Sequence, residues 1–177
     1  MNAAGKSGLL LGLVGAILSL LSYLLLDFLY SGFFTMFVYG FAVLVITIAV
    51  AAHLGLKWRK SIGGFASFGD TFKFLFLMLI IAGVVNLGVE VLLYHVIEPD
   101  LQKITATKVM GATENIMLKY ELPDDQIDET LDKMEDSIEN LSVMERLATF
   151  KWRPLLQAFM AIILSLFIKK EKPLFES

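Results

Sequence analysis

The sequence predicts an all-α integral membrane protein. It should have four transmembrane helices, both termini in the cytoplasm, and an extracytoplasmic helical hairpin between spans three and four. Of the 177 residues, 56% are hydrophobic and 19% are charged, whereas a soluble domain of this length needs more polar surface to stay dissolved. The apolar residues gather in long runs, and the charged residues between those runs form groups of opposite net charge.

Four apolar runs are expected to cross the membrane as helices. They are residues 8–30, 33–56, 71–97 and 148–168. At about 1.5 Å per residue each reaches across roughly 30 Å of hydrocarbon, the fourth least easily. The first run is longer than the apolar core of a signal peptide and no small-residue cleavage pattern follows it, so we expect it to be retained. The chain then divides into spans one to three (1–97), the hairpin (98–147) and span four with a basic tail (148–177).

Span one also carries small residues at spacings of three and four. These are Gly8, Gly12, Gly15, Ser19 and Ser22. Small side chains along one seam let two helix backbones approach closely in a membrane. Packing within this chain is the favoured interpretation, and a homodimer face is the alternative.

The distribution of charged residues predicts the orientation of the chain in the membrane. Eight basic residues are expected on the cytoplasmic side, against three acidic ones: Lys6, Lys57, Arg59, Lys60, Lys73, Lys169, Lys170 and Lys172. Residues 98–153 instead carry 13 acidic and 7 basic residues. Because basic residues near span ends stay in the cytoplasm, both termini are expected there. The inner cluster of Lys57, Arg59, Lys60, Lys169 and Lys170 suits anionic lipid headgroups, with simple anchoring of the topology as the favoured interpretation.

The acidic segment 98–147 is expected to form a hairpin of two helices. Its second helix carries an apolar stripe at heptad spacing, made of Ile127, Leu131, Met134, Ile138 and Leu141. The first helix is expected from Pro99 to Lys119, partly apolar on one face. The stripe must be buried, either against that first helix or against another protein or a second copy of the chain.

Glu90 is the leading candidate for a functional residue within the apolar runs. Asn86 lies one helical turn before it and Tyr94 one turn after it, on the same face. An ionisable group is costly in hydrocarbon, so this face should point into the bundle or a cavity. Asp27 and Gln157 reach a similar depth from spans one and four.

We therefore predict a polar site in the outer leaflet made of Glu90, Asn86, Asp27, Gln157 and Arg153. A structural ion pair or hydrogen-bond cluster that fixes helix register is the favoured interpretation. A functional site that meets a cationic or proton-donating ligand is the alternative.

Several classes of function are not expected. The absence of cysteine excludes a disulfide scaffold, cysteine metal ligands and a thiol nucleophile. A net charge of −3 argues against a nucleic-acid-binding protein. His53 and His95 are predicted on opposite sides of the bilayer, so they cannot share a metal ion. With no nucleophile beside a base and no phosphate-binding motif, we expect neither an enzyme nor a cofactor.

Three segments carry a resemblance to a known family. The loop before span three reads Gly64-Phe65-Ala66-Ser67-Phe68-Gly69-Asp70-Thr71-Phe72-Lys73. The span ends with Tyr94-His95-Val96-Ile97-Glu98-Pro99-Asp100, and an acidic helix follows from Pro123-Asp124-Asp125-Gln126-Ile127. In this order the set resembles the bacterial membrane proteins grouped as domain-of-unknown-function family 4199, over nearly the whole chain.

The resemblance implies a multi-pass protein of the bacterial cytoplasmic membrane, and it brings no established activity. It also implies gene surroundings that include a polyprenyl-phosphate glycosyltransferase. We therefore expect a non-catalytic accessory or scaffold protein that contacts membrane lipids and engages a protein partner, such as that enzyme, or a second copy of itself. The alternative is a small transporter or lipid-binding protein that uses the polar site around Glu90.

Overall fold

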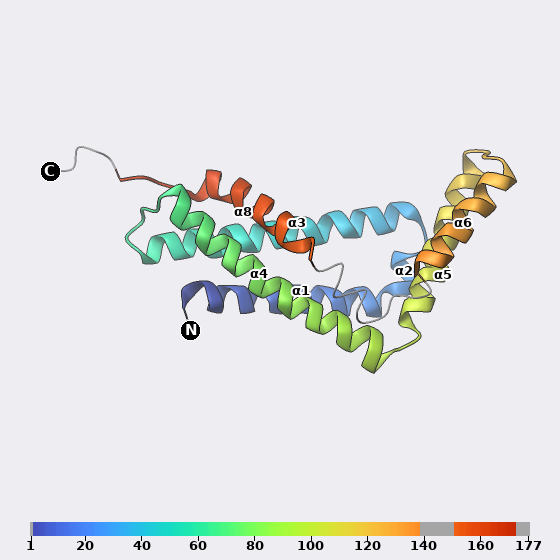
Figure 1. Ribbon diagram of the computed structural model, residues 1–177, viewed down its shortest axis with the longest axis horizontal. Helices are drawn as coiled ribbons and strands as arrows, with labels where there is room; N and C mark the ends of the chain where they lie inside the picture. The colour runs from blue at the N-terminus through green and yellow to red at the C-terminus, as the bar shows by residue number, and fades with distance from the viewer. Residues whose placement is uncertain (1, 139–150, 173–177) are drawn as a thin grey trace. The chain divides into compact units, whose positions relative to one another are not determined.

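The computed structural model describes residues 2–138 and 151–172, and every regular element in these two stretches is a helix (Figure 1). The elements in chain order are α1 (Ala3–Leu24), α2 (Leu26–Leu29), α3 (Phe33–Ser61), α4 (Phe68–Leu92), the π-helical turn η1 (Leu93–Ile97), α5 (Leu101–Lys119), α6 (Asp124–Ile138) and α8 (Arg153–Ile168). The prediction of an all-α protein is confirmed for this part of the chain.

Within the described residues, three helical segments are long and apolar enough to cross a membrane, which indicates a membrane protein. They are Ala3–Leu24, Phe33–Ser61 and Phe68–Ile97. Helix α8 is apolar but has 16 residues, which at about 1.5 Å per residue is shorter than the hydrocarbon layer. Residues 148–150 of the predicted fourth span lie outside the described residues, so that span stays a prediction.

Apart from the earlier starts of α1 at Ala3 and of α4 at Phe68, the described helix boundaries differ from the predicted runs at three places. The first run, 8–30, is divided because α1 ends at Leu24 and the short α2 follows. Helix α3 continues five residues past the predicted end at 56, through the basic cluster to Ser61. The third run ends as a π-helical turn instead of an α-helix, with the Glu98 N–H donating to the Leu93 carbonyl at 3.0 Å.

The chain divides into two compact units, which are described separately. Unit 1 comprises Met1–Ile17, Leu44–Gly88 and Phe150–Ser177, and unit 2 comprises Leu18–Val43 and Val89–Thr149. Unit 1 contains most of α4 together with α8, and unit 2 contains α2, η1, α5 and α6.

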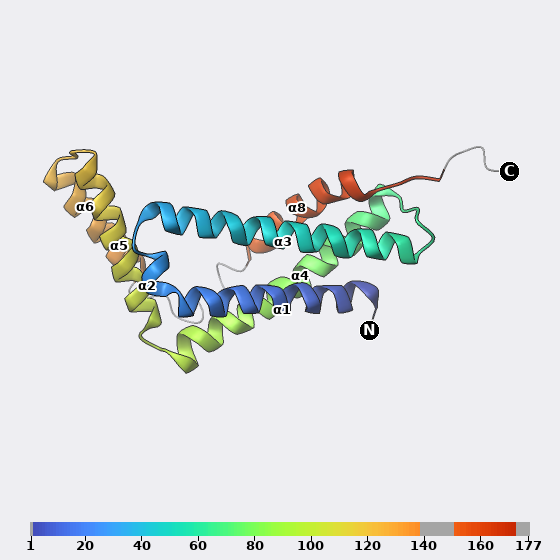
Figure 2. The ribbon, with the colours of Figure 1, turned by 180° about the vertical axis from the view of Figure 1, so that it is seen from behind.

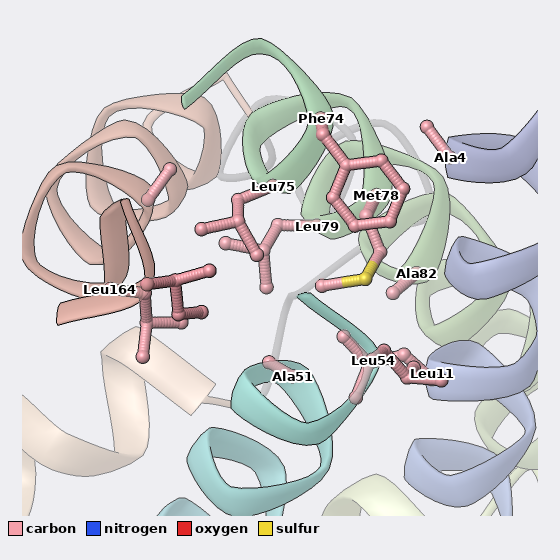
Figure 3. Packing of buried hydrophobic residues seen from close by; sticks show 12 residues of the cluster. Ala4, Leu11, Ala51, Leu54, Phe74, Leu75, Met78, Leu79, Ala82 and Leu164 are labelled. Atoms are coloured by element: carbon pink, nitrogen blue, oxygen red, sulfur yellow. The ribbon is translucent and has the colours of Figure 1, made fainter. Parts of the chain in front are cut away.

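The core of unit 1 is centred on α4. Leu75 and Met78 are 0% exposed, and Figure 3 shows Leu75 and Leu79 facing Leu164 of α8. Trp58 of α3 stacks on Phe74 with 4.3 Å between the ring centroids. These contacts join residues from four helices, namely α1, α3, α4 and α8, in one apolar cluster.

Glycines of α1 allow the close approach of α1 and α4 in unit 1. A Cβ atom on Gly8 would lie 2.7 Å from Cβ of Ile81, and one on Gly12 would lie 2.7 Å from Cβ of Val85. Side chains larger than hydrogen do not fit at these distances. Packing within the chain, the favoured interpretation of the small-residue seam, is therefore confirmed for Gly8 and Gly12.

The loop between α3 and α4 contains the C-terminal cap of α3 and the N-terminal cap of α4. Gly63 and Gly64 have φ of 99° and 84°, and the Gly64 N–H donates to the Arg59 carbonyl at 2.9 Å. This geometry is that of a helix C-terminal cap, where glycine avoids the strain of positive φ. Beyond the glycines, Ala66 and Lys170 exchange two backbone hydrogen bonds, of 2.8 and 3.0 Å.

Ser67 caps the start of α4. Its Oγ accepts the Asp70 N–H at 3.1 Å and donates to Oδ2 of Asp70 at 2.7 Å. We expect Ser67→Ala to cost about 1 kcal/mol, because a helix N–H then loses its partner. The measurement is thermal unfolding of the purified full chain, with Tm falling by about 2–4 °C. Ser61→Ala is the matched control, since the exposed Ser61 hydroxyl donates to a carbonyl and caps no N–H, and equal shifts would contradict the prediction.

In unit 2, α5 and α6 form a helical hairpin. The two helices lie side by side in both views (Figure 2). Tyr120 to Pro123 connect them, and Glu121 takes a positive φ of 52° in this turn. Ile127 of the predicted stripe is 4% exposed, and Leu131 and Met134 are half-buried.

Burial of the stripe within the hairpin is the simpler of the two predicted alternatives, and the contact between α5 and α6 favours it. The backbone of Ile138 belongs to α6, and Leu141 lies outside the described residues. The exposed side of α6 carries a row of carboxylates: Asp124, Asp125, Asp128, Glu129, Asp132 and Glu135.

Candidate functional site

Unit 2 contains a pocket of about 300 Å³ that includes Glu90. Its lining comes from α1, α2, α3, α4, η1 and α5: Ser19, Ser22, Tyr23, Leu26, Leu29, Tyr30, Met36, Tyr39, Glu90, Leu93, Tyr94 and Leu101. The volume is at the lower end of the roughly 300–1,000 Å³ that small-molecule sites occupy. The described part of the lining therefore combines one carboxylate, four tyrosines and two serines with an apolar remainder.

Helical periodicity and a helix break explain the lining from the first half of the chain. Ser19, Ser22 and Tyr23 are spaced by three and four residues, so they share one face of α1. At Leu25 the chain leaves the α1 path and re-forms a turn as α2, which supplies two leucines. Tyr30 caps the end of this short helix.

The π-helical turn supplies the opposite part of the lining. Glu90 lies near the end of α4, and Leu93 and Tyr94 begin η1. A π-turn adds a residue to the helical repeat and changes the direction of the side chains that follow it, and such turns are frequent at functional sites. Leu101, the first residue of α5, is buried and also lines the pocket.

Hydrogen bonds fix part of the polar lining. The Tyr39 hydroxyl donates to the Leu18 carbonyl at 2.8 Å, and Tyr39 Oη lies 2.7 Å from Ser22 Oγ. Ser22 Oγ also lies 2.9 Å from the Leu18 carbonyl, one turn back on α1. Glu90 and Tyr94 are each engaged by an interaction within the protein. The hydroxyl groups of Tyr39 and Ser22 are thus held in place by hydrogen bonds within the protein.

The five predicted polar-site residues fall into different surroundings. Glu90 lines the pocket, whereas Asp27 of α2 is 93% exposed and pairs with Lys108 of α5 at 2.6 Å. The Asn86 amide donates to the Ala82 carbonyl at 2.9 Å and packs against Gly15. In α8, the Gln157 amide donates to the Leu79 carbonyl at 3.1 Å.

Asn86 and Gln157 thus have the structural role of bonding to helix carbonyls of α4 within unit 1. Arg153, also in unit 1, is the first residue of α8 and is engaged by an interaction within the protein. Asp27 belongs to unit 2 and is held at the surface by its lysine partner.

Sequence reasoning missed most of the pocket. Tyr30 and Tyr94 fall at the ends of predicted spans, where aromatic residues are ordinary anchors in the headgroup layer. Tyr39 lies in the second apolar run, and its hydroxyl, which needs a partner there, was the available signal. Ser19 and Ser22 were assigned to the packing seam, although in the structure they line the pocket.

The predicted basic anchor separates into exposed and engaged residues. Lys57, Lys60, Lys169 and Lys170 are exposed. Arg59 is partly buried, and its Nη1 donates to the Ile168 carbonyl at 2.5 Å. Lys170 Nζ lies 5.3 Å from the centre of the Phe65 ring, within the range of a cation–π contact.

Comparison with known proteins identifies a family. A family model described as "Protein of unknown function (DUF4199)" matches residues 6–170, nearly the whole chain. The match confirms the resemblance carried by the loop before α4, the end of η1 and the start of α6. No curated protein and no solved structure matches the chain.

Proposed function

The chain belongs to the DUF4199 family of proteins of unknown function, and we propose that it is a non-catalytic multi-pass membrane protein that binds a small molecule or a lipid headgroup at Glu90. The observation that carries the proposal is the pocket of about 300 Å³, in which a carboxylate stands among tyrosines and leucines. Holding an ionisable group in such surroundings costs free energy, and ionisable residues that are kept despite this cost usually have a function.

The proposal includes a location and an orientation. We place the chain in the bacterial cytoplasmic membrane with both termini inside, because the basic residues cluster at one set of span ends and the acidic residues in 98–153. In this orientation α5 and α6 lie outside the cytoplasm. The pocket, formed by the ends of the spans that adjoin them, is then on the extracytoplasmic side.

Retention of a ligand by the purified protein tests the proposal. The full chain is extracted from its native membrane in a neutral maltoside detergent, and bound small molecules and lipids are identified by mass spectrometry. We expect a stoichiometric molecule on the wild-type protein and at least a tenfold lower occupancy on a folded Glu90→Gln protein, whose Tm falls with the loss of the ligand.

Glu114→Gln is the matched control, because Glu114 is an exposed carboxylate of α5 outside the pocket. It should retain the molecule as the wild type does. A wild-type protein that carries no molecule, or a Glu90→Gln protein with wild-type occupancy, would overturn the proposal.

An accessory or scaffold role is the second candidate, and the exposed carboxylates of α6 favour it. A row of like charges that faces water repels anionic surfaces and suits a partner with a basic patch. In the same purification, a stoichiometric protein partner without a retained small molecule would support this role. A polyprenyl-phosphate glycosyltransferase is one such partner to look for.

A further inference from the structure

We infer that the pocket in unit 2 recognises an organic cation with an alkylated ammonium group. The inference rests on the proposed function and names the chemical class of the ligand. It is carried by three properties of the lining residues: their charge, their aromatic rings and the state of their hydroxyl groups.

The charges of the lining residues indicate the sign of the ligand's charge. Among the described lining residues, Glu90 is the one carboxylic acid, and none is a lysine, arginine or histidine. Glu90 is also half-buried, so its field is screened less by water than that of a surface carboxylate. An anionic group such as a phosphate would find no cationic side chain among the described lining residues, so a cation is favoured there.

The aromatic rings also favour a positively charged ligand, independently of Glu90. Tyr23, Tyr30, Tyr39 and Tyr94 come from four different places in the chain and line one pocket. The face of a tyrosine ring is electron-rich and attracts cations, and several rings together recognise quaternary ammonium groups. The inference therefore does not depend on how Glu90 is engaged within the protein.

The hydroxyl groups favour an alkylated cation over a primary ammonium. A primary ammonium has three N–H donors that need acceptors. The Tyr39 and Ser22 hydroxyls are already bonded to each other and to the Leu18 carbonyl. Five of the other described lining residues are aliphatic, namely leucines from α2, η1 and α5 and one methionine from α3, and they suit methyl or methylene groups around the nitrogen.

The test compares a cation with its neutral isostere. Choline and 3,3-dimethyl-1-butanol have the same shape but differ by the charged nitrogen. Binding of each to the full chain in neutral detergent is measured by calorimetry. We expect choline to bind saturably and at least tenfold more tightly than the alcohol. Dihexanoyl phosphatidylcholine is the second probe: tighter binding than choline indicates a lipid headgroup, and weaker binding indicates a free solute, both within the proposed class.

Two variants of Tyr23 separate the ring from the hydroxyl. Tyr23→Phe keeps the ring and should bind choline within about twofold of the wild type, whereas Tyr23→Leu should weaken binding at least fivefold at an unchanged Tm. Equal binding of the alcohol and choline, or no saturable binding of either choline probe, would overturn the inference. If Glu90→Gln still loses the endogenous molecule in that case, the proposed function stands and only its cationic class fails.

Discussion

Gly12→Leu is expected to destabilise the protein by about 2–3 kcal/mol, the cost of forcing extra atoms into a filled interface. The added Cβ alone would lie 2.7 Å from Cβ of Val85 and 2.9 Å from its Cγ1. Val85 is branched at Cβ and cannot rotate away from such a contact. Small residues let helix backbones approach closely in a membrane, so with leucine at this position α1 would have to move off α4 in unit 1.

Thermal unfolding of the purified full chain measures the effect, with Tm expected to fall by about 5–10 °C. Gly40→Leu is the matched control, because a Cβ on Gly40 of α3 meets nothing within 4 Å. Leucine is the better helix former at such an exposed site, so Tm should stay or rise slightly. A Gly12→Leu protein as stable as Gly40→Leu would show that the α1–α4 contact is not as close as described.

Local patterns made part of the fold predictable. The seam of Gly8 and Gly12 repeats every four residues on one helix, and this spacing is a property of the helix alone. Apolar length likewise identified the three described helical segments that are long enough to cross a membrane. The break at Leu25 and the π-turn at Leu93 were not predictable, because neither contains a glycine or a proline and the leucines at each suit a continuing α-helix.

The candidate site was predictable only at its charged residue. A carboxylate in an apolar run is costly, and that cost identified Glu90 from the sequence. Burying a tyrosine carries no such free-energy cost, since its ring is stable both in apolar surroundings and at the membrane surface. The partner of Asp27 was out of reach for a different reason: Lys108 is distant in sequence, and its ion pair with Asp27 depends on how α5 packs in unit 2.

The basic cluster shows how similar residues acquire different roles. From the sequence, Lys57, Arg59 and Lys60 are predicted to anchor the topology together, because all three lie at the end of the same helix. In the structure Arg59 alone of the three donates to a backbone carbonyl of another helix, that of Ile168, within the described residues. This bond places a positive charge at the C-terminus of α8, where the helix dipole is negative.

Arg59→Ala is therefore expected to cost about 2 kcal/mol, the usual range for a hydrogen bond from a charged donor. The Ile168 carbonyl would lose this partner at a buried residue, and Tm should fall by about 4–8 °C. Lys60→Ala removes a neighbouring charge that is exposed, and it should leave Tm within about 1 °C. If headgroup anchoring were the role of all three cations, the two variants would behave alike. A larger fall in Tm for Arg59→Ala than for Lys60→Ala means that the Arg59 side chain stabilises the contact between α3 and α8.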